Sequence, residues 1–280
     1  MKWLRCLVSV LFVGALPALG QTLYDAALGT PPDQQGWGFV SVPFPAEQIM
    51  VDASVQLNTF ASSTVLAGYS RLAPVPLDRT NGFRVAFTLR LQVEIHNTTN
   101  RAGLSVVVLG ADKRGLELAF WPERVWAQSD SPLFTQAEGT YFDTTFAFVT
   151  YELAFTATSY VLRADGKELL TGPVRDYTAF TGIIDPYETP DFLFIGDDTT
   201  SAKASFGLRR VELLTTLPPP VVSFTPPAAG TDKLTVTWPA GHKLQRATRL
   251  SPPDWADFAA DPPLAVPFAG PGEFFRAVPK

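Results

Sequence analysis

One stretch of the sequence, Arg101 to Gln128, holds several side chains that could bind a ligand. In its middle, apolar residues alternate with positions that include Glu117 and Trp121. Because strand side chains point alternately to two faces, this carboxylate and this indole share one face of the expected strand. An indole can stack on a sugar ring, and carboxylate, amide and guanidinium groups can bind its hydroxyls. The predicted ligand-binding residues are Glu117, Trp121, Trp126, Gln128, Arg101, His96 and Arg90.

Core packing is the alternative role for the same residues. One tryptophan could fill the core while the other caps a strand end. Glu117 discriminates better between the two roles, because a carboxylate on a sheet cannot be buried without a partner. Arg90, Arg101 or Arg114 could supply that partner. Both interpretations stay open at the level of the sequence.

Catalytic groups are sparse in the sequence. A retaining glycoside hydrolase needs two carboxyl groups about 5–5.5 Å apart, but Glu117 stands alone among the acidic residues of its expected strand. No serine lies in a Gly-x-Ser-x-Gly elbow. A polysaccharide lyase would use groups such as those of His96, Arg90 and Gln92, which are expected on one face of a strand. We therefore predict a protein without catalytic activity, with a polysaccharide hydrolase or lyase as the alternative.

Five acidic residues gather between positions 185 and 198. Calcium takes oxygen ligands from loops, so this segment is a candidate calcium site. The spacing fits no fixed template, and simple solvation of an acidic loop is the alternative. No other cofactor is predicted. The candidate ligands are Asp185, Glu188, Asp191, Asp197 and Asp198.

The N-terminus has the pattern of a secretory signal peptide, which we assign to residues 1–20. Lys2 and Arg5 precede an apolar core from Leu7 to Val13, and small residues precede the expected cleavage before Gln21. This pattern predicts a protein that is secreted, periplasmic or at the cell surface. The apolar core is shorter than the ~20 residues of a membrane-spanning helix. No later stretch is long and apolar enough either, so no transmembrane segment is expected after cleavage.

Charge and composition restrict the partners and the fold. The formal net charge is −5, and it becomes more negative when Lys2 and Arg5 leave with the signal peptide. This charge argues against nucleic acid and anionic membranes as partners. The single cysteine, Cys6, lies in the signal peptide, so no disulfide is expected in the mature chain. The 25 prolines, 20 glycines and 21 phenylalanines are typical of short strands joined by turns.

Alternating residue patterns predict many short strands. The clearest one extends from Phe83 to His96, where Phe83 and every second residue to Ile95 are expected on the buried face. A single strand is also expected at Ile49–Asn58, and Asp165-Gly166 predicts a hairpin turn. Segments 129–140 and 177–190 are expected to be irregular. Further strands are expected at 36–42, where the strand should lie at a sheet edge, and at 65–71, 104–109, 116–121, 146–158, 192–196 and 206–214.

Strands at this spacing, without helical units between them, predict a β-sandwich. The hairpin YVLRADGKELLTG and the following FLFIGDDTTSAKASFGLRRVEL resemble the late strands of concanavalin A-like (laminin-G-like) jelly-roll domains. The segment GYSR…DRTNGF…NRAGLSVVVL…GLELAFWPERVWAQ resembles a bacterial version found in exported proteins. The resemblance covers about Tyr24 to Leu214. It implies an all-β fold, a concanavalin A-like jelly-roll β-sandwich, for residues 21–216.

A proline-rich linker is expected at 217–227, because Leu217 is followed by three prolines that cannot continue a ladder of strand hydrogen bonds. Beyond it, LTVTWP, KLQRA, PDWAD and EFFR resemble a small C-terminal module of exported bacterial proteins. The fold of that module looks like an immunoglobulin or fibronectin type III sandwich. The resemblance implies a small β-sandwich domain for residues 228–280.

These features predict an exported, non-catalytic, two-domain protein that binds a glycan or another extracellular or cell-surface ligand. The first alternative is a structural or adhesive surface protein whose polar sheet contacts another protein. The second is the polysaccharide-active enzyme considered above.

Overall fold

The computed structural model describes residues 19–61, 64–182, 185–215, 222–225, 233–238, 242–249, 254–267 and 273–279. The chain divides into two compact units, one of which is Ala18–Thr216, while the described C-terminal strands belong to the other. The predicted signal peptide lies outside the described residues, except that Leu19 and Gly20 begin strand β1 (Leu19–Asp25). Within the described residues, no helix has both the length and the hydropathy of a membrane span.

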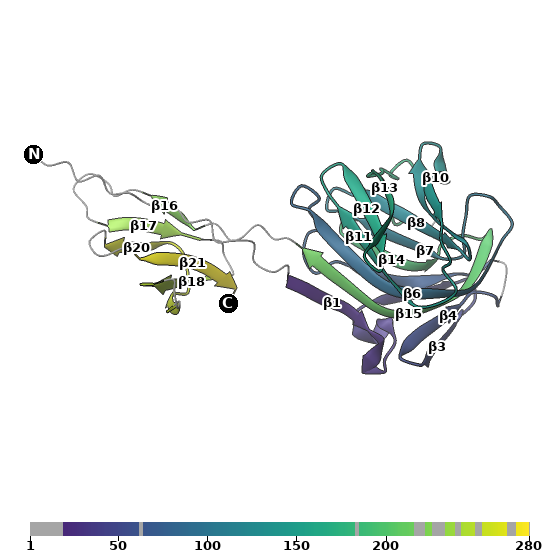
Figure 1. The fold of residues 1–280 in the computed structure, drawn as a ribbon, viewed down its shortest axis with the longest axis horizontal. Coiled ribbons are helices and arrows are strands. Elements are labelled where there is room, and N and C mark those ends of the chain that lie inside the picture. Colours follow the sequence, from purple (N-terminus) through teal and green to yellow (C-terminus); the bar gives the residue numbers. More distant parts are fainter. Residues whose placement is uncertain are drawn as a thin grey trace, which may run out of the picture. The chain divides into compact units, whose positions relative to one another are not determined.

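The first unit contains two antiparallel sheets (Figure 1). The first, called sheet A, also includes β1, which pairs with β15 (Ala202–Thr215). Two short 3₁₀ helices, η1 (Ala26–Leu28) and η2 (Pro32–Gln35), follow β1. In spatial order, sheet A contains β13 (Lys167–Pro173), β12 (Ser159–Ala164), β11 (Val149–Phe155), β6 (Phe83–His96), β15 (Ala202–Thr215), β4 (Ser54–Asn58) and β3 (Glu47–Val51).

The second sheet of this unit, called sheet B, contains most of the stretch from Arg101 to Gln128. The strand expected at 36–42 is β2 (Gly38–Val42), which lies at the sheet edge as predicted. In spatial order, sheet B contains β10 (Leu133–Tyr141), β9 (Arg124–Asp130), β8 (Gly115–Trp121), β7 (Ser105–Leu109), β14 (Phe192–Asp197), β5 (Leu66–Leu72) and β2 (Gly38–Val42).

The core of the first unit lies between the inner faces of the two sheets. Phe87 of sheet A and Phe120 of sheet B meet edge to face at a centroid distance of 6.4 Å, and the Tyr151 ring contacts both. All three rings are fully buried. Full burial of one large apolar side chain stabilises the fold by about 1.5–3 kcal/mol, so the alternating residues of the facing strands hold the layers together. The predicted fold class, an all-β concanavalin A-like jelly-roll sandwich, is confirmed.

Strand β6 has the predicted bounds but not the predicted alternation throughout. Val93 and Ile95 were expected inside, yet they are exposed, while Glu94 between them is buried. Leu91 is opposite Phe206 and Val93 is opposite the adjacent Ser205, so no β15 residue lies opposite Gln92 in the strand register. Such a β-bulge adds one residue and reverses the alternation beyond it. The bulge therefore turns the Glu94 carboxylate inward.

Four turn and strand predictions have different outcomes. The Asp165-Gly166 turn is confirmed, with φ of 46° and 81° between β12 and β13. The single strand expected at Ile49–Asn58 is wrong, because Asp52 and Ala53 have φ of 50° and 51° and turn the chain into the β3–β4 hairpin. Segment 129–140 was expected to be irregular, but most of it belongs to β10, which pairs with β9. Segment 177–190 contains no strand among its described residues, as predicted.

The second unit contains two three-stranded sheets among its described residues. One consists of β16 (Ser223–Thr225), β17 (Lys233–Thr237) and β20 (Leu264–Pro267), and the other of β19 (Ala256–Ala259), β18 (His242–Ala247) and β21 (Phe274–Pro279). Val236, Leu244 and Ala277 form a buried core between the sheets, so the predicted small β-sandwich is confirmed. Strand β16 lies inside the predicted linker but pairs with β17, and it therefore belongs to this unit. The likeness to immunoglobulin or fibronectin modules stays a prediction.

Candidate ligand-binding site

The outer face of sheet B carries four of the predicted ligand-binding residues. Glu117 and Trp121 lie on β8, and Trp126 and Gln128 lie on β9. Leu116, which precedes Glu117 on β8, packs in the core on the opposite face. The two indoles meet edge to face at a centroid distance of 4.6 Å. Alternation along both strands therefore brings these side chains to one face, as predicted.

The two tryptophans pack against the protein on that face. Trp126 has no exposed surface. The His96 ring stacks on Trp121 at a centroid distance of 3.9 Å and an angle of 7°. The Trp121 Nε1–H group donates a hydrogen bond to the Arg101 carbonyl (3.0 Å). His96 Nδ1 in turn lies 2.9 Å from a Glu94 carboxylate oxygen. Trp126 therefore cannot stack on a ligand in this structure, and one face of Trp121 is covered by His96.

Glu117 is fully buried behind this surface. Its Oε1 lies 3.2 Å from Arg101 Nη1, and its Oε2 accepts a hydrogen bond from the Tyr187 hydroxyl (2.5 Å). Burial, together with the nearby charge of Asp198, raises the pKa of Glu117, and the Arg101 charge opposes that rise. The expectation that a buried Glu117 needs an arginine is thus met by Arg101.

Two other predicted arginine partners and Gln128 have different neighbours. Arg114 pairs with Asp176 (3.4 Å) at an exposed position. Arg90 lies on β6 of sheet A, with its guanidinium 5.3 Å from the centre of the Phe148 ring. It is in the other layer of the sandwich and does not reach the Glu117 face. The Gln128 amide donates to the Asn100 carbonyl (2.9 Å) and so anchors the loop that carries Arg101.

A cavity of about 530 Å³ opens on the outer face of sheet B, over β5, β14 and β7. Its volume is within the usual range of small-ligand sites. Phe134 comes from β10, while the loop between β13 and β14 supplies further side chains. Arg101, Asp185, Asp198, Thr199 and Thr200 add polar groups to the lining. The aromatic residues that line the cavity are Phe134, Phe180, Tyr187, Phe192 and Phe194.

Two glycines make room for one of these rings. Gly68 of β5 and Gly196 of β14 are cross-strand partners. A Cβ atom on Gly68 would lie 2.5 Å from the Phe194 ring, and one on Gly196 would lie 2.4 Å from the Ala67 carbonyl oxygen. Real side chains do not tolerate such distances. The glycine pair therefore allows the Phe194 ring to lie directly against the sheet at the cavity.

Arg101 connects the cavity to the buried carboxylate behind it. Besides its contact with Glu117, its Nη2 binds Asp198 Oδ1 (3.0 Å), and its guanidinium lies 4.7 Å from the centre of the Phe134 ring. The Ser105 hydroxyl donates to the same Asp198 oxygen (3.1 Å). One guanidinium thus bridges two carboxylates, and this fixes the polar edge of the cavity.

The five candidate calcium ligands do not meet at one point. Asp185, Asp197 and Asp198 line the cavity, but Glu188 pairs with Lys113 and Asp191 accepts a hydrogen bond from the Leu77 amide (2.7 Å). In the part of the chain that the structure describes, no three His, Cys, Asp or Glu side chains are placed to hold a metal ion together. The structure therefore does not assemble the predicted calcium ligand set.

Asp197 is a buried carboxyl at the inner edge of the cavity. Its Oδ2 accepts a hydrogen bond from the Thr59 hydroxyl (2.7 Å), and its Oδ1 accepts one from the Thr199 amide (3.1 Å). Burial raises the pKa of Asp197 to about 8, although both hydrogen bonds oppose the rise. The carboxyl is therefore largely protonated in the folded protein at neutral pH.

The raised pKa of Asp197 predicts a pH-dependent stability. The unfolded chain releases this proton near the ordinary value of 3.8, whereas the folded protein keeps it up to about pH 8. The carboxyl thus stabilises the fold below pH 4, and that contribution disappears as the pH rises to about 8. Asp197→Asn retains an acceptor for the Thr199 amide and cannot ionise. We expect urea unfolding to show the variant gaining stability over the natural protein, by several kcal/mol, from pH 4 to 8. A stability difference between Asp197→Asn and the natural protein that does not change with pH would contradict the raised pKa of Asp197.

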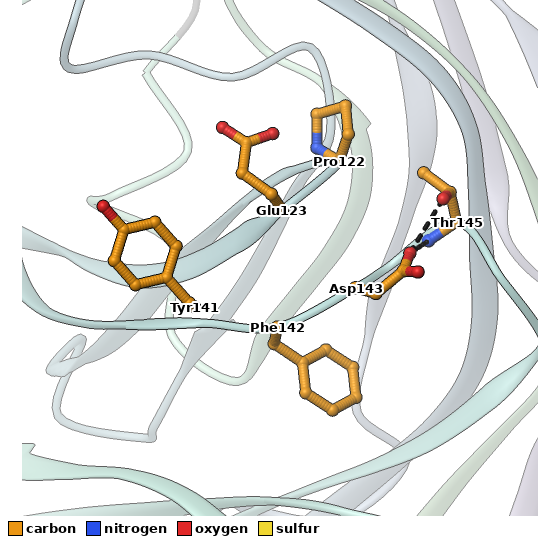
Figure 2. Close-up of a pocket in the computed structure, with 6 residues that line it drawn as sticks. All are labelled: Pro122, Glu123, Tyr141, Phe142, Asp143 and Thr145. Carbon is orange, nitrogen blue, oxygen red and sulfur yellow. Dashed lines mark hydrogen bonds between the residues drawn. The ribbon is translucent and has the colours of Figure 1, made fainter.

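A second hollow lies at the turn between β8 and β9 and the segment after β10 (Figure 2). Figure 2 shows Phe142 pointing away from the side chains of Glu123 and Tyr141. The Phe142 ring packs against Tyr151 at 6.0 Å. The Asp143 carboxylate accepts hydrogen bonds from the Thr145 amide and hydroxyl (2.9 and 2.8 Å). Asp143 and Thr145 thus serve a local turn, and the cavity over β5, β14 and β7 is the better candidate site.

Of the residues that line the cavity, the sequence predicts Arg101, Asp185, Asp197 and Asp198 as site residues but not the aromatic ones. Phe194 alternates with the core residues Leu193 and Ile195, and this pattern was available as a signal that it points outward. Phe180 and Tyr187 lie in a segment without regular periodicity. Their position in the cavity depends on how the loop folds back over sheet B.

Solved structures with similar folds include three proteins that act on or recognise carbohydrate. The carbohydrate esterase vb_24B_21 of Shiga toxin-encoding bacteriophage phi24B is 14% identical, with a TM-score of 0.48, and the match covers 72% of this chain and 99% of that one. The metal-free carbohydrate recognition domain of Emp46p is 10% identical, with a TM-score of 0.40 and coverage of 69% and 95%. The Crh5 transglycosylase in complex with NAG is 12% identical, with a TM-score of 0.44 and coverage of 73% and 87%. No protein-family model and no curated protein sequence matches the chain.

Proposed function

We propose that the first unit binds carbohydrate, without catalysis, in the cavity over β5, β14 and β7. The observation that supports this proposal is the combination of aromatic rings with a few fixed polar groups in one cavity. The apolar C–H face of a sugar ring packs on an aromatic ring, and its hydroxyls need hydrogen-bond partners. Phe194 against Gly68 provides such a ring at the sheet surface.

The polar edge of the cavity suits hydroxyl groups. Arg101 and Ser105 both contact Asp198 through Oδ1. This fixed ion pair of Asp198 and Arg101 lies in the cavity lining beside Thr199 and Thr200. Because Arg101 is also held by Glu117, this edge is positioned before a ligand arrives. Preorganisation of this kind reduces the entropy cost of binding.

The proposal of binding without catalysis rests on the burial and the ion pairing of the carboxyl groups. Glycoside hydrolysis needs two carboxyl groups that reach the ligand. Glu117 is sealed behind Arg101 and Tyr187, and Asp198 is engaged by Arg101 and Ser105. Neither His96 nor any other histidine is among the described residues that line the cavity.

One observation favours a second candidate function, a polysaccharide-active enzyme. Asp197 borders the cavity with a pKa of about 8 because of its burial, and a protonated carboxyl beside an ionised one is the arrangement of a general acid. Both of its oxygens are, however, occupied by Thr59 and Thr199. Release of reducing ends from a polysaccharide by the purified protein would favour this second function.

Carbohydrate binding predicts a strong effect of Phe194→Ala. Loss of a stacking ring should raise the Kd for a glycan found on a glycan array about tenfold, which corresponds to ~1.4 kcal/mol. Titration calorimetry with the full chain measures the change. Phe146→Ala is the matched control, because Phe146 is 87% exposed and is not part of the cavity lining. Equal affinities of the two variants would contradict this site, and a failure of the natural protein to bind any glycan would favour the structural or adhesive alternative.

A further inference from the structure

The charges around the cavity are not balanced. Asp185, Asp197 and Asp198 line it, and Arg101 is the single lysine or arginine among the described lining residues. That guanidinium is shared with a fourth carboxylate, since it contacts both Asp198 (3.0 Å) and Glu117 (3.2 Å). Even with Asp197 and Glu117 protonated, two carboxylates face one guanidinium. A ligand with a positive charge would supply the missing cation.

The walls of the cavity suit an organic cation better than a metal ion. Calcium takes six to eight oxygen ligands, but among the described residues no three acidic side chains are placed to hold a metal ion together. Aromatic rings attract an ammonium group placed over their faces. The protein already uses this interaction once at the site, where the Arg101 guanidinium lies over the Phe134 ring. Phe180, Tyr187 and Phe194 extend the aromatic surface.

Asp185 is the carboxylate best placed to meet such a group. Its Oδ1 accepts a hydrogen bond from the Tyr187 amide (3.0 Å), and among the described residues no arginine or lysine pairs with it. Asp198, in contrast, already has Arg101. An ammonium group in the cavity would therefore find one unpaired carboxylate on the same loop as two aromatic rings.

We propose that this cavity selects sugars with a free, protonated amino group, such as oligomers of glucosamine, over neutral and N-acetylated sugars. This proposal rests on the proposed carbohydrate function and specifies the class of sugar that binds. The sugar ring stacks on Phe194, and the ammonium group lies near Asp185. Acetylation removes the positive charge and adds bulk, so the matched N-acetylated oligomer binds more weakly.

The test compares three oligosaccharides of equal length by titration calorimetry with the full chain. They are built from glucosamine, N-acetylglucosamine or glucose, in a buffer that keeps the amine protonated. We expect the glucosamine oligomer to bind about tenfold more tightly than the other two, and added salt to reduce this preference. Asp185→Asn keeps an oxygen for the Tyr187 amide but removes the charge. It should abolish most of the preference for the glucosamine oligomer.

Asp191→Asn is the matched control, because it removes a carboxylate from the same loop outside the cavity. Asn tolerates the φ of 58° at this position and keeps an acceptor for the Leu77 amide. This control should retain the preference for the amine. Equal binding of the amine and its acetylated form would overturn the selection but keep the carbohydrate function. Absence of binding by all three and by a wider glycan array would overturn the carbohydrate function itself. Calcium that binds and displaces the amine would assign the carboxylates to a metal and overturn the selection.

Discussion

Replacing Arg101 with methionine is expected to lower the free energy of unfolding by about 3 kcal/mol or more. The substitution leaves Glu117 fully buried without its counter-charge and also removes the partner of Asp198. The folded variant can keep Glu117 inside only in its protonated form. Because the unfolded chain ionises this carboxyl near its ordinary pKa of 4.5, stability falls as the pH rises above that value. Urea unfolding of the variant and of the natural protein at neutral pH measures the loss.

Two further variants separate the lost charge from the lost side chain. Arg114→Met removes an arginine that is 57% exposed and pairs with Asp176 at 3.4 Å, and it should change stability by no more than about 0.5 kcal/mol. Adding Glu117→Met to Arg101→Met removes the stranded carboxylate, and the double variant should recover much of the loss. If Arg101→Met costs no more than Arg114→Met, the buried ion pair does not stabilise the sheet B face.

Local sequence patterns sufficed to place Glu117 on the outer face of a strand and to require an arginine for it. They could not choose between Arg90, Arg101 and Arg114. The choice depends on contacts between distant segments, since Tyr187, which shares Glu117 with Arg101, is 70 residues away in sequence. Alternation reports which face a residue occupies, but not which loop will later cover that face. For the same reason the indoles Trp121 and Trp126 share a face as predicted and are nevertheless packed against the protein.

Strand pairing overrides alternation at the end of β6. Nothing in the residues around Gln92 indicates a bulge, because the extra residue is defined by the register with β15. The prediction for β10 was wrong for a different reason. Most of its residues from Leu133 to Gly139 are half-buried rather than alternately buried and exposed, so the segment has no two-residue pattern to detect. The turn at Asp52 and Ala53 lacks the glycine that usually marks a hairpin.

Local sequence patterns also could not predict the aromatic lining of the cavity. Its rings come from three separate segments: β10 with Phe134, the loop with Phe180 and Tyr187, and β14 with Phe194. Each segment is short, and its sequence alone would equally fit aromatic residues that are buried in the core. Their convergence follows from the order of strands in sheet B, where β14 lies beside β7 and β5. That order is a property of the whole fold.

Gly115→Ala is expected to destabilise the first unit by more than about 4 kcal/mol, a loss that few single substitutions reach. A Cβ atom at this position would lie 1.8 Å from the Val108 carbonyl oxygen and 2.8 Å from the Leu109 Cα atom. Both are backbone atoms of the neighbouring strand β7, so no side chain can move aside. On its other side, Gly115 exchanges two backbone hydrogen bonds with Arg175 (3.0 and 2.9 Å). The strand therefore cannot shift away from β7 without losing its contact with the segment that leads into the cavity loop.

Denaturant unfolding of the full chain measures this effect, with Gly38→Ala as the matched control. Gly38 also lies in a strand of sheet B, but the nearest atom to its added Cβ would be the Ser70 hydroxyl oxygen at 3.4 Å, so that variant should stay within about 1 kcal/mol of the natural protein. Where Gly115→Ala still folds, glycan affinity should fall as well, because displacement of Arg175 moves the loop that carries Phe180 and Tyr187. A Gly115→Ala protein as stable as Gly38→Ala would show that β8 does not pack between β7 and Arg175 as the structure places it.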